Sequence, residues 1–329
     1  MGSRTASIVI RTLNEERYLP DLLRAIREQA LDSDLQLEVV LVDSGSTDST
    51  VRIARSFDCN IVHIDRRMFS FGRSLNWGCE RARGDILVFI SGHCVPVDRN
   101  WLTRLCQPLS DGVASYAYGR QVGDDDSFFS ERRIFAQYYS GENAVPQNGF
   151  FCNNANSALL RDVWSANRFD EDLTGLEDME LARRITANGH RIAYVAEAPV
   201  YHHHRESWAQ IKRRFEREAI ALQNIMPAVH LSRLDVARYF ATSVLLDFRS
   251  AWQHNCLLPE WLNIVRYRWA QYSGSHKGNH ELRRLSQSQK ERFFYPSVNE
   301  SESQNAWLRR HRRATAHKGE QPARKGQEL

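Results

Sequence analysis

The feature that most constrains the fold of this chain is an apolar run, Leu37 to Val42, followed directly by an acid and a loop of small residues. The loop reads Asp43-Ser44-Gly45-Ser46-Thr47-Asp48-Ser49-Thr50, and the residues after it have helical spacing. A valine-rich run of this length is typical of a buried parallel strand. In open α/β sheets, ligands bind outside the carboxyl ends of such strands. Asp43 is therefore either a ligand-facing carboxylate or part of a well-capped strand-to-helix turn, and this stretch alone favours neither.

Predicted strands and helices alternate through the rest of the amino-terminal part of the chain. Apolar runs predict strands at 6–12, 37–42, 60–64, 85–90, 113–119 and 191–195. Segments with one apolar helical face predict helices, among them 73–83, 128–139 and 177–188. This rhythm predicts an α/β fold with a doubly wound, mostly parallel sheet flanked by helices.

The character of the sequence changes after His204. The chain has 329 residues and a net charge of +4, but lysine and arginine dominate from Arg205 onward, among aromatic residues with helical spacing. From Asn299 the sequence is polar and basic. We therefore expect an α/β domain at 1–204, a helical extension at 205–298 and a basic, disordered tail at 299–329. The basic and aromatic extension fits attachment to an anionic membrane surface.

Composition also indicates in which cellular compartment the protein works and which partners it binds. Six scattered cysteines without Cys-x-x-Cys spacing argue against a zinc knuckle or a disulfide framework, and they favour a reducing compartment. The start of the sequence has no apolar signal core, and no apolar run reaches transmembrane length. The expected location is cytoplasmic, peripheral on the cytoplasmic face of the cell membrane. No nucleic-acid partner is expected, because the modest charge comes without a recognised nucleic-acid motif.

Four blocks of sequence carry a more specific signal through their order and spacing. They are Ile8 to Glu15, Val42 to Asp48, the strand ending at Ser91-Gly92-His93, and Leu176-Glu177-Asp178 followed by Val200-Tyr201-His202. Together they resemble the family 2 glycosyltransferases, which have a GT-A-type fold, and within that family the rhamnosyltransferase-like branch. The resemblance covers about Ser7 to Glu218. It implies that 1–204 is the GT-A nucleotide-sugar-binding and catalytic domain, and that the extension at 205–298 is an acceptor cap or a membrane-surface attachment. It implies an inverting enzyme that moves a sugar from a nucleotide-diphosphate donor to a hydroxyl of a saccharide or lipid-linked acceptor, in cell-surface polysaccharide synthesis.

The resemblance also implies roles for individual residues. Asp178 would be the base that takes the acceptor's proton, and Glu177 would orient the acceptor or the start of a helix. Glu15 and Asp43 would contact the nucleoside, whereas Arg73 and Asn76 are either sugar or pyrophosphate contacts or a solvated helix start. The full set of expected donor-binding residues is Thr12, Asn14, Glu15, Asp43, Ser44, Gly45, Arg73, Asn76, Ser91 and Gly92.

One position departs from the family's pattern. The family holds a divalent cation with an Asp-x-Asp sequence, and this chain has Ser91-Gly92-His93 there. By resemblance His93 and His202 are the expected ligands, and His204 joins them because alternate residues of an extended segment share a face. Histidine ligands favour Mn²⁺, with Mg²⁺ as the alternative. Because Ser91 supplies no carboxylate, two rivals stay open: a site in which Arg73 carries more of the phosphate charge, and a catalytically silent nucleotide-sugar-binding module.

Overall fold

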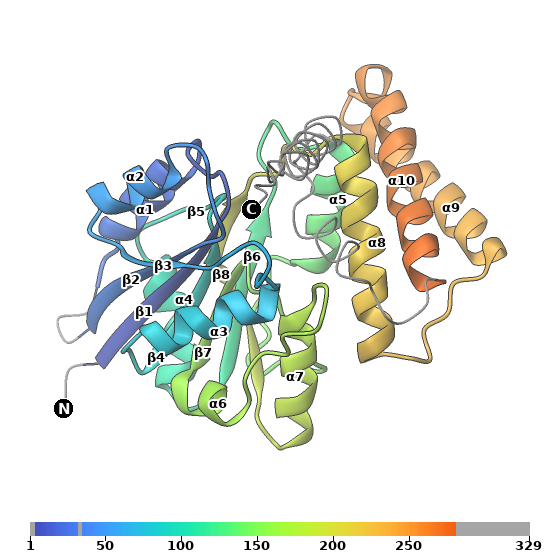
Figure 1. The fold of residues 1–329 in the computed structure, drawn as a ribbon. Coiled ribbons are helices and arrows are strands. Elements are labelled where there is room, and N and C mark those ends of the chain that lie inside the picture. The colour runs from blue at the N-terminus through green and yellow to red at the C-terminus, as the bar shows by residue number, and fades with distance from the viewer. Residues whose placement is uncertain (1–3, 32–34, 281–329) are drawn as a thin grey trace, which may run out of the picture. The chain divides into compact units, whose positions relative to one another are not determined.

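An eight-stranded sheet runs through the part of the chain that the computed structural model describes, residues 4–31 and 35–280 (Figure 1). The strand order is β3-β2-β1-β4-β7-β6-β8-β5. The strands are β1 (Arg4–Thr12), β2 (Leu35–Asp43), β3 (Asn60–His63), β4 (Ile86–Ser91), β5 (Cys94–Pro96), β6 (Tyr116–Val122), β7 (Asn156–Leu160) and β8 (Ile192–His202).

The sheet is mixed rather than uniformly parallel. β1 to β4 run parallel to one another, as the sequence predicts, and their carboxyl ends lie at one edge. β7 is antiparallel to both β4 and β6, whereas β6 and β8 are parallel and the short β5 is antiparallel to β8. The α/β class is confirmed, and β5 and β7 account for the antiparallel part.

Helices cover both faces of the sheet and extend beyond it. They are α1 (Leu19–Arg27), α2 (Thr50–Ser56), α3 (Phe71–Arg81), α4 (Trp101–Ser110), α5 (Phe129–Tyr138), α6 (Arg161–Ala166), α7 (Glu177–Ala187), α8 (Trp208–Ile225), α9 (Arg233–Gln253) and α10 (Leu257–Asn279). Side chains of each strand alternate between two cores. In β1, Ile8 and Ile10 belong to the core that contains Leu22 of α1, whereas Val9 belongs to the core that contains Leu75 of α3.

The carboxyl-terminal helices α8, α9 and α10 lie side by side, which confirms the predicted helical extension (Figure 1). Gly274 and Gly278 bring α10 against the backbone of α8, at Lys212 and Glu216, with no room for a Cβ at either glycine. Phe129 of α5 packs against Ala251 and Ile264, which joins this helical group to the sheet domain. The boundary at residue 204 stays a prediction, and residues 281–298 and the tail at 299–329 lie outside the described residues. Among the helices described, none combines the length and apolarity needed to cross a membrane.

Candidate active site and metal centre

Two loops interlock at the carboxyl ends of β1 and β2. Asn14 has a left-handed backbone (φ 58°), and its side-chain Oδ1 accepts a hydrogen bond from the Thr47 N–H at 2.8 Å. The Ser44 N–H and Oγ both donate to the Thr12 carbonyl, at 3.1 and 3.0 Å. The structure therefore brings the predicted residues Thr12, Asn14 and Ser44 together at one edge of the sheet.

Asp43 closes the turn that opens this loop. Its buried carboxylate accepts from the N–H groups of Gly45 and Ser46, at 3.1 and 3.2 Å. Gly45 has a φ of +93°, a conformation that side chains with a Cβ rarely adopt. Asp43 thus caps the strand-to-helix turn, and its contact with a nucleoside stays a prediction.

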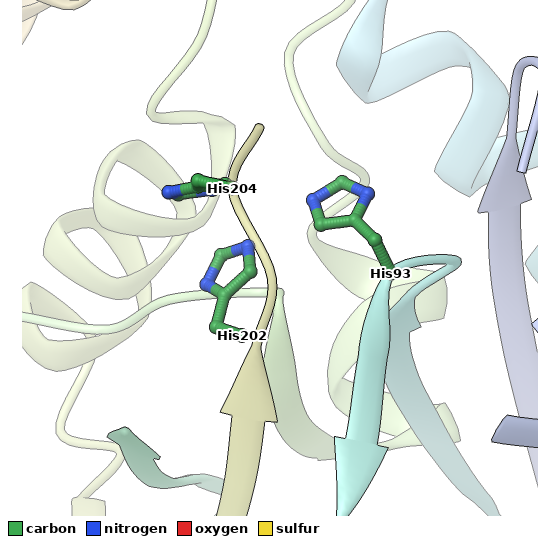
Figure 2. Close-up of side chains that lie close together, drawn as sticks. All are labelled: His93, His202 and His204. Carbon is green, nitrogen blue, oxygen red and sulfur yellow. The ribbon is translucent and has the colours of Figure 1, made fainter. Parts of the chain in front are cut away.

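The pairing of β5 with β8 brings distant histidines together. Cys94 lies opposite His202, and the His203 N–H donates to the His93 carbonyl at 3.1 Å. Figure 2 shows the rings of His93 and His202 turned toward each other, with His204 two residues further along the chain. One potential ligand atom from each of these three residues lies within 4.8 Å of the others. The three predicted metal ligands therefore form one cluster.

His203 faces the other way, as the alternation of an extended segment requires. Its ring stacks on Tyr18 with the centroids 4.5 Å apart, and its Nδ1 lies 2.5 Å from the Asp124 carboxylate.

Each histidine of the cluster is held by an oxygen at its Nδ1. The partners are Glu15 for His93 at 2.7 Å, Gln121 for His202 at 2.6 Å and Glu131 for His204 at 2.8 Å. An oxygen acceptor at Nδ1 fixes the proton there and leaves the Nε2 lone pair for a cation. The donor set therefore fits a divalent metal with a preference for nitrogen ligands.

Only one of the three residues that hold the histidines belongs to one of the four blocks that the sequence analysis singled out. Glu15 belongs to a recognised block, but the sequence pattern gave no sign that it would hold His93. Gly92 makes that contact possible, because a Cβ at this position would lie 2.9 Å from Glu15 Cγ. Gln121 and Glu131 were missed, since they lie on β6 and α5, far from His202 and His204 in the chain.

A register shift in the sheet aims Gln121 at His202. β6 and β8 pair regularly as far as Gly119 and Val195, and pairing resumes at Gln121 and Val200. The β8 strand thus has three more residues in this interval than β6 has. Because three is an odd number, the β8 residues after the interval point to the opposite face of the sheet from the one that regular pairing would give.

The charge state of the cluster depends on its neighbours. Burial, together with nearby His204 and His93, lowers the pKa of His202 well below its usual value, which keeps the imidazole neutral. Burial also disfavours the charged form of His93, but the adjacent Glu15 carboxylate outweighs this and raises the pKa of His93.

Another acidic group, formed by Glu131, His204 and Glu206, lies close by. Arg214 neutralises it, because its Nη2 lies 2.7 Å from Glu131 and its Nε lies 2.8 Å from Glu206. Burial disfavours the Glu131 carboxylate, yet His204 and Arg214 bring its pKa down to about 2. This group is therefore an ion-pair network, and the three histidines are the better metal site.

Asp178 is the second chemical centre of the site. It lies in the first turn of α7, and its buried carboxylate accepts from the N–H groups of Asn154 and Met179, both at 2.8 Å. Burial and the neighbouring Glu177 carboxylate raise the pKa of Asp178 to about 7. A carboxylate with a pKa near neutrality can act as a general base at physiological pH.

Glu177 makes an ion pair with Arg11, a residue that the sequence analysis missed. The Arg11 Nη1 lies 3.1 Å from Glu177 Oε1, and the Arg11 charge also acts on His93. Arg11 thus connects the acidic pair with the histidine cluster. Leu176, directly before this pair, has a left-handed backbone with a φ of 56°, which is uncommon for a branched side chain.

Arg73 and Asn76 come together on Glu171 rather than with the other predicted donor-binding residues. The Arg73 Nε lies 2.6 Å from Glu171, and Asn76 Nδ2 donates to the same carboxylate at 3.0 Å. The Asn76 Oδ1 accepts from Trp164 Nε1 and the Phe169 N–H. Because Asn76 is buried and its amide is fully engaged within the protein, we assign it to supporting this loop, and donor contact by Arg73 stays a prediction.

Part of the chain matches a known protein family. Residues 7–166 match the model of the Glycosyl transferase family 2. This match places residues 7–166 in the family 2 glycosyltransferases.

Particular relatives support the expected branch within the family. The chain is 27% identical to the O-antigen chain rhamnosyltransferase RfbN of Salmonella typhimurium, over 60% of this chain and 66% of that protein. It is 29% identical to the O-antigen chain rhamnosyltransferase WbaN of Salmonella anatum, over 51% of this chain and 56% of that protein. The match spans less than two thirds of the length of either relative.

A solved structure supports the fold. The mannosyltransferase PcManGT from Pyrobaculum calidifontis, in complex with GDP-Man and Mn²⁺, superposes with a TM-score of 0.59 at 16% identity. The superposition covers 83% of this chain and 86% of that one. This likeness concerns the arrangement of helices and strands.

Proposed function

We propose that this protein is an inverting glycosyltransferase that moves a sugar from a nucleotide-diphosphate donor to a hydroxyl of a saccharide or lipid-linked acceptor. The observation that carries the proposal is Asp178, a buried carboxylate with a pKa of about 7. It follows Glu177, whose ion-pair partner Arg11 also acts on the charge of His93. The O-antigen rhamnosyltransferases among the relatives support a role in cell-surface polysaccharide synthesis.

Asp178 is the proposed base. As the acceptor hydroxyl attacks the anomeric carbon, the Asp178 carboxylate takes its proton, and the bond to the donor diphosphate breaks. A single displacement of this kind inverts the anomeric centre and needs no covalent sugar intermediate. Glu177, held by Arg11, is proposed to orient the acceptor.

The loops after β1 and β2 are the proposed nucleoside wall. There Ser44 donates to the Thr12 carbonyl, Asn14 accepts from the Thr47 N–H, and Asp43 shapes the turn. A rhamnose donor is favoured by the two relatives, and a nucleotide-diphosphate sugar in general is favoured by the GDP-Man in the PcManGT structure.

His93, His202 and His204 are the proposed ligands of a divalent cation, with Mn²⁺ preferred. Their fixed Nδ1 protons leave nitrogen lone pairs for the metal. When bound, such a cation would neutralise charge on the departing diphosphate. The PcManGT complex, which contains Mn²⁺, supports this preference.

A donor hydrolysis screen tests the function. Nucleotide-diphosphate sugars are incubated with the full chain, with and without Mn²⁺, and release of the nucleotide diphosphate is measured. The rate of this release should fall by about 10²- to 10⁴-fold in Asp178→Asn, because no base then takes the proton of the attacking water. Glu180→Gln, on the same helix but bonded to Arg184, is the control and should retain activity. A donor that binds the wild-type protein without any turnover would favour the silent binding module instead.

A direct binding measurement tests the metal ligands. Titration with Mn²⁺, followed by electron paramagnetic resonance, should show a site that His93→Ala or His202→Ala weakens by at least about tenfold. His203→Ala is the matched control, because His203 faces Tyr18 and Asp124. Equal loss in all three variants would contradict the assignment.

We also propose a peripheral location on the cytoplasmic face of the membrane, with an anionic lipid surface as a partner.

A further inference from the structure

One face of α10 is apolar and points to solvent. Leu258, Trp261, Leu262, Val265 and Trp269 follow one another at the spacing of a single helical face. The exposed fractions of Leu258, Trp261 and Trp269 are 88%, 51% and 61%. Side chains of this size and spacing normally turn toward a core.

The opposite face of α10 already has its partners. Ile264 packs against Phe129 of α5, Tyr267 packs against Ile211 of α8, and the two glycines approach the α8 backbone. The exposed apolar residues are therefore additional to the packing that holds the helix in place, and they need a separate explanation.

The neighbouring helix α9 presents a similar face. Leu234, Leu245 and Trp252 are exposed, with Trp252 at 73%, and they lie on one side of the helix. Exposed arginines Arg238 and Arg249 lie along the same side.

The charges on these two helices favour an anionic partner. Arg238, Arg249 and Arg266 are exposed. Of the acids, Asp247 is buried and paired with Arg268. Asp235, which caps α9 with Ser232, and Glu260, which accepts from Asn263, keep their charge but are only partly exposed. Tryptophan and leucine interleaved with arginine are typical of segments that lie in the interface of an anionic bilayer.

We infer that the exposed faces of α9 and α10 dock on an anionic lipid surface, with the tryptophans and leucines inserted and the arginines at the headgroups. None of the described helices could span the bilayer, so the helices lie along its surface. This inference deepens the proposed function and rests on it only in assigning the surface a lipid-linked acceptor.

The docking helices are attached to the active site through α5. Phe129 packs against Ala251 of α9 and Ile264 of α10, and Glu131, two residues further along α5, holds His204. A membrane bound by α9 and α10 is thus connected by direct packing to the histidine cluster, which suits an acceptor presented from the lipid surface.

Co-sedimentation with vesicles tests the inference. The full chain is mixed with vesicles of phosphatidylcholine alone, or with one third phosphatidylglycerol, at low and high salt. We expect binding to the anionic vesicles that weakens in high salt. Leu258→Ser with Trp261→Ser should lower the partition coefficient by about tenfold or more, since two large apolar side chains no longer insert. Arg249→Gln with Arg266→Gln should lower it by about fivefold per arginine at low salt and flatten the salt dependence.

The controls use exposed side chains away from α9 and α10. Leu31→Ser with Val97→Ser, and Arg55→Gln with Arg67→Gln, should bind as the wild type does. Melting temperatures are measured for every variant, and they should stay unchanged because all the altered side chains are exposed.

Three results would overturn the inference: no sedimentation of the wild type at low salt, wild-type binding by the Leu258 and Trp261 variant, or a solution dimer that this variant dissociates. The last result would mean that a second copy of the chain covers the face. Donor hydrolysis in the absence of vesicles is measured in parallel. Because it needs no membrane, failure of docking and failure of the proposed function are distinguishable.

Discussion

The environment of Asp178 raises the pKa of its carboxyl group and also lowers the stability of the folded protein when that group is charged. Its carboxylate is buried at the start of α7 and lies beside the Glu177 carboxylate, so the charged form is disfavoured. The two backbone N–H groups that it accepts from offset only part of that cost. The same burial that would keep a base poised near neutrality therefore destabilises the folded state at higher pH.

The pH dependence of Asp178 should appear in both activity and stability. The pKa rises from 3.8 to about 7 on folding, so kcat should increase with pH up to about 7 and fall by about tenfold per unit below that. Between these two values the folded state binds more protons than the unfolded state. Stability contributed by protonated Asp178 is therefore complete below pH 4 and is lost as the pH rises through 7.

Measurement of kcat and of the melting temperature between pH 4 and pH 8 checks both parts. The melting temperature of Asp178→Asn relative to the wild type should rise across this window. A flat kcat profile between pH 5.5 and 8 would contradict the assignment of Asp178 as the base.

At the residue scale, the sequence predicted the types of groups better than their contacts. The Glu177–Asp178 pair, the three histidines and the loop residues after β1 and β2 came from recognised blocks. The roles of Arg11, Gln121 and Glu131 were not predicted, although Arg11 lies in a recognised block, because they depend on pairings between segments far apart in the chain. Asn76 shows a second difficulty. A polar residue near the start of a helix can be buried and fully hydrogen-bonded within the protein, and no local pattern in the sequence indicates this.

At the element scale, the close packing of α8 and α10 depends on two glycines. A Cβ at Gly278 would fall inside the contact distance of the Glu216 carbonyl, and Gly274 meets the Lys212 carbonyl in the same way. A backbone carbonyl within a helix cannot move aside as a flexible side chain can, so the helices would have to separate.

Gly278→Ala should therefore lower the free energy of unfolding by about 1–3 kcal/mol, despite the better helix propensity of alanine. Urea denaturation followed by circular dichroism measures this. Gly141→Ala is the control, because a Cβ there meets nothing within 4 Å, and it should change stability by less than about 0.5 kcal/mol. Equal stabilities for the two variants would mean that the helices are packed more loosely than the structure indicates.

Most of the elements were predictable because each has its own local pattern. The strands at 37–42 and 85–90 are nearly continuous apolar runs, and the α3, α5 and α7 patterns fit within a few residues. β5 and α6 were missed, since a three-residue strand and a six-residue helix leave too little periodicity in the sequence. The antiparallel direction of β7 depends on the end of the sheet at which the preceding loop brings the chain back, and no local sequence pattern specifies this.

At the scale of the whole molecule, a buried ion pair joins the carboxyl-terminal helices to the sheet domain. Arg268 of α10 contacts both carboxylate oxygens of Asp247 of α9, at 2.8 and 3.0 Å. The Ser130 hydroxyl of α5 donates to the same carboxylate at 2.7 Å. Three helices thus meet at one buried charge.

Arg268→Leu should destabilise the protein by about 2–3 kcal/mol, because the buried Asp247 carboxylate keeps only the more exposed Arg133, 3.6 Å away, as its cation. Thermal unfolding by calorimetry measures the loss. Arg104→Leu, which removes a half-exposed ion pair with Asp98, is the control and should cost less than about 1 kcal/mol. A small effect of Arg268→Leu would show that the carboxyl-terminal helices contribute little to the stability of the whole.

The overall plan was predictable because a single family resemblance covered the sheet domain, and a change in composition marked the helices after it. The way the two parts join was not, since Phe129, Ser130 and Asp247 have no distinguishing pattern in the sequence.

The register shift between β6 and β8 determines which face of the sheet each later side chain of β8 points to. Three additional residues of β8 place His202 and His204 on the side of the histidine cluster. Loss of a single residue from this interval, for example exposed Glu197, would advance the chain by one position. His203 would then take the place of His202, and Arg205 would take the place of His204. A one-residue deletion in β8, outside the histidine cluster itself, would thus put a guanidinium where the His204 imidazole lies. Insertions or deletions of two residues would keep the same side chains on each face.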